Sequence, residues 1–339
     1  MIKKTLAMAA LATLALAHAA EARDQITIVG SSTVFPFSTA VAEQFGKIGK
    51  FKTPVVESNG TGGGIRLFCS GVGADFPDIA DASRAITASE VELCAKNGVT
   101  SISEITIGYD GIVFVDAKQS GKLALTREDV YKAIAKDVVV GGKLTPNPYK
   151  KWSDINPALP ALPIQVYGPA PNHGTRDALV ELVLNDACGK VPEIKALDKD
   201  AKKQACEALR EDGAFVEVAE NYSVTVQKVG ATPGSLGIVG FSFGEQSADK
   251  VTMASIDGVD PTYESIAANK YPVSRPLFFY VKKQHVGVIP GLKEFIAEYT
   301  SEKSWGKEGY LADRGLIALP DAVRKDAAKR AAELPELKN

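Results

Sequence analysis

Three segments rich in glycine and hydroxyl residues each stand where a β-branched, apolar run gives way to a helical pattern. They are residues 30–34, 58–64 and 172–177. Glycine lets the backbone approach a ligand closely, and the first turn of a helix leaves N–H groups unpaired at its positive end. Three such turns that converge would bind a tetrahedral oxyanion. The second segment lacks the Gly-Lys-Ser/Thr ending of a nucleotide-triphosphate loop, and a plain capping turn is its alternative interpretation.

Charged side chains near these turns could complete an anion site. Arg84 ends the sequence Ala-Asp-Ala-Ser-Arg, and Arg176 follows the third turn. A planar guanidinium can pair with two oxygens of a tetrahedral anion. Phosphate near neutral pH carries at least one proton and sulfate carries none, so a carboxylate such as Asp81 or Glu57 in the site would favour phosphate. A structural ion pair, a helix cap or an exposed position is the alternative for each of the four.

The first residues predict export from the cytoplasm. Lys3 and Lys4 precede an apolar run over residues 6–17, and small-residue cleavage patterns follow. This order is typical of a secretory signal peptide, here residues 1–22. The apolar run is too short for a transmembrane helix, so we expect no direct membrane insertion.

The cysteines fit an oxidising compartment. Four remain after cleavage, at Cys69, Cys94, Cys188 and Cys206, and none forms a Cys-x-x-Cys pair. An even number in an exported chain predicts two disulfides. Of the three connectivities that four cysteines allow, we expect Cys69–Cys94 with Cys188–Cys206, because each of these bonds closes a local loop.

Composition limits the class of protein. A chain of 339 residues, 45% of them hydrophobic, predicts two domains with ample core. The net charge of −2 and the lack of a basic stripe interleaved with aromatics argue against nucleic-acid binding. Neither His173 nor His285 shows a metal-ligand spacing. An anion would therefore have to be held by local geometry.

Strand and helix patterns alternate along the chain, which predicts α/β layers with ligand turns at the carboxyl ends of strands. The expected strands are residues 26–29, 53–56, 105–115, 165–167, 237–243 and 276–281. The expected helices are residues 34–46, 65–69, 89–97, 127–135, 175–186, 199–212, 288–300 and 303–310, with a polar terminal helix over 319–339.

A serine hydrolase is the rival class. Residues 240–244 match the pattern Gly-x-Ser-x-Gly around Ser242, with Asp257 or Asp260 and then His285 in hydrolase order. A nucleophile elbow needs a helix directly after the serine. The alternation over residues 237–243 instead predicts a strand, followed by a turn over 245–250, which disfavours the hydrolase.

Five motifs together resemble one family. Residues 30–33, 58–64, 81–84, 174–177 and 271–277 resemble, in order, the motifs of the periplasmic phosphate-binding protein of the phosphate ABC transporter, the PstS family. The likeness covers nearly the whole mature chain. It implies an α/β fold of the type II periplasmic-binding-protein class, with two α/β lobes joined by a two-segment hinge. By analogy, lobe I would be residues 24–110 plus 273–339 and lobe II residues 111–272, with the hinge near 107–115 and 271–280.

The resemblance also implies which residues hold the ligand. Many members carry an Asp at the position of Arg84 and an upstream Arg before the third turn. This chain departs from both patterns, which leaves Asp81 or Glu57 as proton acceptor and Arg84 or Arg176 as the cation. Asn221 is a further polar candidate. The expected ligand-binding set is Ser32, Thr33, Val34, Thr61, Gly62, Asp81, Ser83, Arg84, His173, Gly174, Thr175 and Arg176.

The implied function is capture without catalysis. An exported periplasmic protein of this kind would bind inorganic phosphate in the interlobe cleft and deliver it to an inner-membrane ABC permease complex. We expect a monomer with no cofactor, no metal and no nucleic-acid partner. Because helix termini alone do not select among oxyanions, sulfate or molybdate is the alternative ligand.

Overall fold

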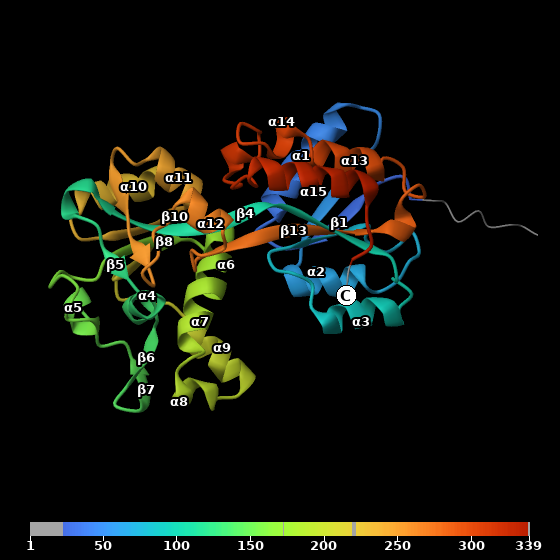
Figure 1. Ribbon diagram of the computed structural model, residues 1–339. Helices are drawn as coiled ribbons and strands as arrows, with labels where there is room; N and C mark the ends of the chain where they lie inside the picture. Colours follow the sequence, from blue (N-terminus) through green and yellow to red (C-terminus); the bar gives the residue numbers. More distant parts are fainter. Residues whose placement is uncertain (1–22, 172, 219–221, 338–339) are drawn as a thin grey trace, which may run out of the picture.

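The computed structural model describes residues 23–171, 173–218 and 222–337. The expected signal peptide and Asn221 lie outside these ranges. Within them, strands alternate with helices that cover both faces of a sheet, so the predicted α/β class is confirmed (Figure 1). Every helix in the described ranges is too short or too polar to span a lipid bilayer.

A single long strand, β4 (Ile102–Ala117), runs through both halves of the molecule (Figure 1). Residues 102–111 of β4 pair with antiparallel β13 (Ser274–Lys282), and residues 112–115 pair with β10 (Leu236–Gly240). The strand order is β2-β1-β3-β13-β4-β10-β8-β9, and β11 (Val251–Met253) also pairs with β4. The two halves therefore share one backbone ladder where they meet.

The first half is built on three short parallel strands, β1 (Thr27–Gly30), β2 (Val55–Ser58) and β3 (Ile79–Ala82). Their side chains alternate between two faces, as the pleat requires. Ile28 packs with α1 and α13, whereas its neighbour Val29 packs with α2. The helices of this half are α1 (Phe35–Lys47), α2 (Thr61–Phe68), α3 (Ala88–Lys96), α13 (Leu292–Tyr299), α14 (Glu302–Trp305) and α15 (Asp321–Glu333), with 3-10 turns η3 (Lys283–His285) and η4 (Ala312–Arg314).

The second half surrounds one continuous core on parallel strands β8 (Val166–Pro169), β9 (Phe215–Val218) and β10. Its helices are α4 (Arg127–Ile134), α5 (Trp152–Ile155), α6 (Gly174–Leu179), which continues through η2 (Val180–Leu184) into α7 (Asn185–Cys188), α8 (Pro192–Lys195), α9 (Lys199–Glu207), α10 (Tyr222–Ala231), α11 (Phe241–Gln246) and α12 (Tyr263–Ala267). Two small ladders, β5 (Ala124–Leu125) with β12 (Ser255–Ile256) and β6 (Asp137–Val140) with β7 (Lys143–Pro146), and the 3-10 turn η1 (Lys118–Ser120) complete this half.

Both predicted disulfides are confirmed. Cys69–Cys94 ties the end of α2 to α3, and Cys188–Cys206 ties α7 to α9. Each bond therefore braces a helix pair within one half of the molecule, as the local pairing requires.

One expected element is wrong. The strand predicted over residues 237–243 ends at Gly240, and α11 replaces its last residues, while the turn expected over 245–250 is present over 247–250. The reason lies in packing that a period-2 pattern cannot show. A Cβ on Gly244 would lie 2.8 Å from Cγ2 of Val113, so glycine at this point lets α11 pack closely onto β4.

Candidate functional site

The first predicted turn lies between the end of β1 and the start of α1. A Cβ on Gly30, whose φ is +138°, would lie 2.2 Å from the Asp81 carbonyl oxygen, so only glycine fits there. The next amide, that of Ser31, donates to the same oxygen at 2.9 Å. Ser32 and Thr33 follow in the loop, and among the described residues no side chain caps the first turn of α1. This turn is therefore held against the end of β3 with helix N–H groups beside it.

The second turn meets the first at the start of α2. A Cβ on Gly64 would lie 2.2 Å from Cα of Gly30, so α2 approaches the end of β1 backbone to backbone. The Thr61 hydroxyl oxygen accepts from the Ser83 amide at 3.1 Å and lies 3.1 Å from its hydroxyl. The ends of β1, β2 and β3 thus bring Thr61, Ser83 and the first turn together.

Arg84 follows Ser83 but is fully engaged by a neighbour. Its two terminal nitrogens donate to the two carboxylate oxygens of Glu90 at 2.9 and 2.8 Å. These hydrogen bonds to Glu90 raise the pKa of Arg84, and Glu181 adds a weaker attraction across the interlobe space. The Arg84 guanidinium lies close to Gly62 of the second turn, since a Cβ added at Gly62 would be 3.5 Å from Nη2 of Arg84. Arg84 therefore stands beside the second turn as one half of an ion pair.

The third turn lies against the first. A Cβ on Gly174 would lie 3.4 Å from Cα of Thr33, so the start of α6 reaches across from the second half. His173 Nδ1 accepts from the Thr175 amide at 3.1 Å, which makes His173 the N-cap of α6. The Thr175 hydroxyl hydrogen-bonds the Tyr222 hydroxyl. The structure thus brings together side chains or backbone from all three predicted turns.

Arg176 points to other partners. Its Nε donates to the Pro169 carbonyl at 3.0 Å, its Nη2 pairs with Glu217, and its guanidinium lies 5.2 Å from the ring centre of Phe215. These partners all belong to β8 and β9. The guanidinium is thus engaged within the second half.

Asp81 is buried beneath the first turn. Burial raises the pKa of its carboxyl to about 7, although the nearby Ser38 hydroxyl favours the charged form. One of its oxygens has no hydrogen-bond partner among the described residues. Tyr299 is a further neighbour, since the Asp81 charge raises the pKa of that phenol. The carboxyl therefore lies on the face of β3 that packs against α1 and α13.

Arg275 on β13 is the residue that the sequence predictions missed. Its side chain is 6% exposed, and its Nη2 donates to Oγ1 of Thr33 at 2.8 Å. Its Nε pairs with Asp110 on β4 at 3.3 Å, and its Nη1 pairs with Glu181. Burial raises the pKa of Asp110, while Arg275 lowers it. An arginine directly before the apolar run of residues 276–281 was the available signal, because a buried cation needs partners.

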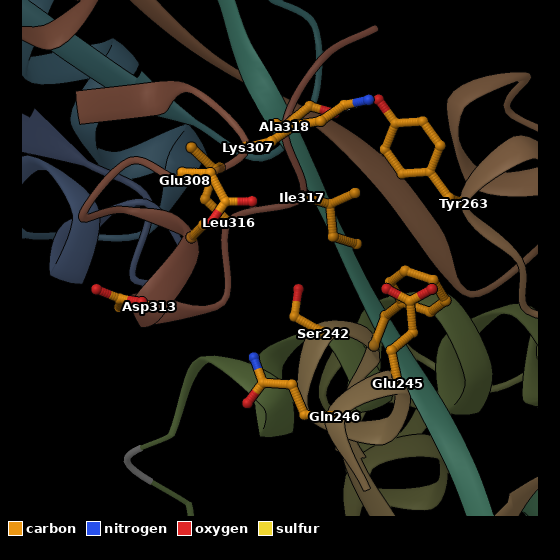
Figure 2. A pocket seen from close by; sticks show the side chains of 12 residues that line it. Ser242, Glu245, Gln246, Tyr263, Lys307, Glu308, Asp313, Leu316, Ile317 and Ala318 are labelled. Carbon is orange, nitrogen blue, oxygen red and sulfur yellow. Dashed lines mark hydrogen bonds between the residues drawn. The ribbon is translucent and has the colours of Figure 1, made fainter. Parts of the chain in front are cut away.

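Two cavities open at this junction. The smaller, of about 180 Å³, is lined by residues of the first and third turns together with Asp110 and Tyr222. The larger, of about 480 Å³, lies between α11 and the segment 307–318, and both include Ser242 and Gln246 (Figure 2). Figure 2 shows Ser242, Glu245 and Gln246 on one side of the larger cavity and Glu308 and Asp313 on the other.

Ser242 lies in the first turn of α11, and a nucleophile elbow does require a helix at this point. The histidine and the aspartates that a serine hydrolase would need lie elsewhere. His285 is buried with Nδ1 2.6 Å from Asp78 Oδ1 and Nε2 2.9 Å from the Val72 carbonyl. Asp257 pairs with Arg127, and Asp260 pairs with Lys122. The expected Ser-Asp-His order therefore forms no triad in the described structure.

Comparison with known proteins decides the family. A family model described as a PBP superfamily domain matches residues 16–303. The chain belongs to this superfamily. The protein SphX of Synechococcus elongatus is 32% identical over 273 residues, which cover 79% of this chain and 71% of that protein. The phosphate-binding protein PstS of Staphylococcus saprophyticus is 28% identical over 91% of this chain and 83% of its own.

Solved structures agree with the superfamily assignment. A possible phosphate binding protein from Planctomyces limnophilus superposes with a TM-score of 0.73 at 28% identity, covering 92% of this chain and 99% of that one. An ABC-type phosphate transport receptor from Vibrio cholerae shares the fold, with a TM-score of 0.59 at 22% identity over 87% of this chain and 100% of its own. The type II periplasmic-binding-protein fold is thereby confirmed for this PBP superfamily member, and its relatives are solute-binding proteins.

Proposed function

We propose that this chain captures inorganic phosphate between two lobes and delivers it to an inner-membrane ABC permease. The observation that carries the proposal is Arg275, a buried guanidinium on β13 that donates to Thr33 beside the start of α1. A cation, hydroxyl groups and the N-termini of helices then surround one small space, which suits a tetrahedral oxyanion. The names of the relatives support phosphate as that anion.

We assign the ligand contacts to the three turns with Arg275 added. Ser32, Thr33, Val34, Thr61, Gly62 and Ser83 would contribute from lobe I, and His173, Gly174 and Thr175 from lobe II. Arg84 and Arg176 remain candidates whose guanidinium groups would first have to leave Glu90 and Glu217. Asp110 joins Asp81 as a candidate proton acceptor, because its carboxyl pairs with Arg275 and lines the smaller cavity.

We further propose lobe boundaries at residues 24–110 plus 273–339, and 111–272. Separate cores support this division, because apart from Ile317 the buried residues of one core all fall between 112 and 273. The strands β4 and β13 would form the hinge, and phosphate would stabilise the closed state by binding it better than the open one. Export by the predicted signal peptide would place the protein in the periplasm as a monomer.

Isothermal titration of the anion-free mature protein with phosphate, sulfate and molybdate tests the proposal. We expect one-to-one phosphate binding that Thr61→Ala weakens about tenfold or more, because a buried hydroxyl contact to a charged ligand is lost. Thr100→Ala, which removes an exposed hydroxyl that lines neither cavity, serves as the control and should bind as the parent does. Binding of sulfate or molybdate in place of phosphate would overturn the ligand, whereas an esterase activity lost in Ser242→Ala would overturn the class.

A further inference from the structure

Two carboxylates one helical turn apart face lobe I from the third turn. Asp177 lies in α6 and Glu181 in η2, which continues α6 without a break, so their spacing of four residues places them on one side. Both side chains make contacts outside their own helix, with groups of β13 and of the first turn. They therefore bridge the space between the proposed lobes.

Glu181 pairs with Nη1 of the buried Arg275 guanidinium. The Nη2, Nε and Nη1 atoms of Arg275 donate to Thr33, Asp110 and Glu181, respectively. The Asp110 side chain is 19% exposed, whereas that of Glu181 is 54% exposed. Glu181 is therefore the carboxylate that can move into water more readily when another anion approaches Arg275, because more than half of its side chain is already exposed.

Asp177 likewise accepts a hydrogen bond from a hydroxyl of the first turn. The Ser32 hydroxyl donates to Asp177 Oδ2 across the interlobe space. A hydroxyl and a guanidinium that lie next to each other in lobe I and the hinge are thus both bonded to carboxylate oxygens from lobe II. Carboxylate and phosphate oxygens accept from the same donors with similar geometry.

We propose that Asp177 and Glu181 act as an internal anion that holds the empty cleft closed and that the ligand must displace. The proposal rests on the phosphate-binding function above. Other ionisable groups near this space are Asp110, His173 and Arg84, which pairs with Glu90, and Asp313 and Arg314 also line the smaller cavity. Because Asp110 and Glu181 occupy two donors of Arg275 and Asp177 occupies the Ser32 hydroxyl, an arriving anion reaches these donors only when Asp177 and Glu181 move away.

Two consequences follow from displacement. Contacts that exist only in the empty protein stabilise it relative to the complex, so they lower the apparent affinity for the anion. The same contacts also close the lobes before the ligand arrives. Removing the carboxylate charge should therefore raise affinity and open the empty protein at the same time.

Titration calorimetry with inorganic phosphate tests the first consequence. We expect Glu181→Gln to bind phosphate about threefold more tightly or better, and Asp177→Asn to change in the same direction. Glu211→Gln is the matched control, because it removes the same charge from a lobe II carboxylate that is 86% exposed and pairs with Lys136. Unchanged or weakened phosphate binding in Glu181→Gln, relative to the control, would overturn the proposal.

Small-angle X-ray scattering of the anion-free protein tests the second consequence. We expect the parent to have nearly the same radius of gyration with and without phosphate, and the Asp177→Asn/Glu181→Gln double variant to expand only when phosphate is absent. Equal expansion of the parent and the double variant without phosphate would overturn the proposal. The comparison of the parent with the double variant in the absence of phosphate needs no ligand, so it stands even if titration shows that the parent binds no phosphate and the proposed function fails.

Discussion

At the scale of single residues, the cation that contacts the first turn comes from the motif over residues 271–277, for which no ligand contact was predicted. Arg84 and Arg176 stand next to glycine-rich turns and pair with glutamates, whereas Arg275 pairs with Glu181 and also donates to Thr33 of the first turn. The hydroxyl residues of the turns could be predicted because their types and order are local. The contact between Arg275 and Thr33 could not be predicted, because the two residues are 242 positions apart and only the folded chain brings them together.

The first residue-scale prediction concerns the shape of this cation. Arg275→Lys keeps the positive charge beside Asp110 but loses the planar fork that reaches Thr33 and a second acceptor together. We expect phosphate affinity to fall about tenfold or more, with unfolding by urea little changed. Arg84→Lys, made in parallel, should cost less because Glu90 holds that side chain. The opposite ranking of the two variants in titration calorimetry would assign the main cation to Arg84.

A second residue-scale prediction follows from Asp81. Burial raises the pKa of its carboxyl to about 7 in the folded protein, so the folded state holds a proton that the unfolded state has already lost. The stability that this proton provides is full at pH below the unfolded pKa and is lost as the pH rises through about 7.

Asp81→Asn should therefore remove a pH dependence of stability. Relative to the parent, the variant should gain about 2–3 kcal/mol in the free energy of unfolding between pH 5 and pH 8. Urea unfolding at the two values measures this difference, with the exposed Asp75→Asn as control. A parallel shift of both variants with pH would show that Asp81 is charged in the folded protein throughout.

At the scale of elements, backbone contacts between glycines fix the turns relative to one another. Gly64 lets α2 rest on Gly30 at the end of β1, and a disulfide fastens the other end of α2 to α3. The strand β1 and the helix α3 of this region were predicted from apolar periodicity, whereas β3 was not expected and α2 begins four residues before the predicted start at residue 65. The helix α11 was not predicted either, because its start at Phe241 depends on packing against β4 and its residues alternate as a strand would.

Gly64→Ala should disturb the site without touching the ligand. The new methyl group would lie 2.2 Å from Cα of Gly30, so α2 must move away from β1 and carry Thr61 with it. We expect both weaker phosphate binding and a loss of about 1–3 kcal/mol in the free energy of unfolding. Gly98→Ala is the control for binding, because no atom lies within 4 Å of the position that its Cβ would take. We expect Gly98→Ala to bind phosphate as the parent does. It is not a control for stability, because its φ of +83° strains any residue other than glycine.

At the scale of the whole molecule, β4 and β13 join the core of the second half to the two apolar clusters on either face of the first half's sheet, and the proposed site lies at that junction. The family resemblance predicted this type II architecture from five short motifs. Which contacts close the space between the halves could not be predicted, because the bonds of Asp177 and Glu181 depend on how the halves face each other.

Ligand binding at such a junction should stabilise the whole chain. If phosphate binds only the folded protein, an excess of one hundred times the dissociation constant adds about 2.7 kcal/mol to the free energy of unfolding. We expect the melting temperature to rise with the logarithm of phosphate concentration and to stay constant in sulfate. An equal rise in both salts would indicate a general salt effect rather than a specific site.

The larger cavity has a practical consequence. Its walls come from α11 on one side and from the segment 307–318 on the other, so its width must change whenever those two parts move relative to each other (Figure 2). A polarity-sensitive dye attached through Gln246→Cys would sit at this seam, near but not on the turns proposed to hold the anion, and all four native cysteines are already bonded. The molecule thereby offers a place for an optical reporter of dissolved phosphate.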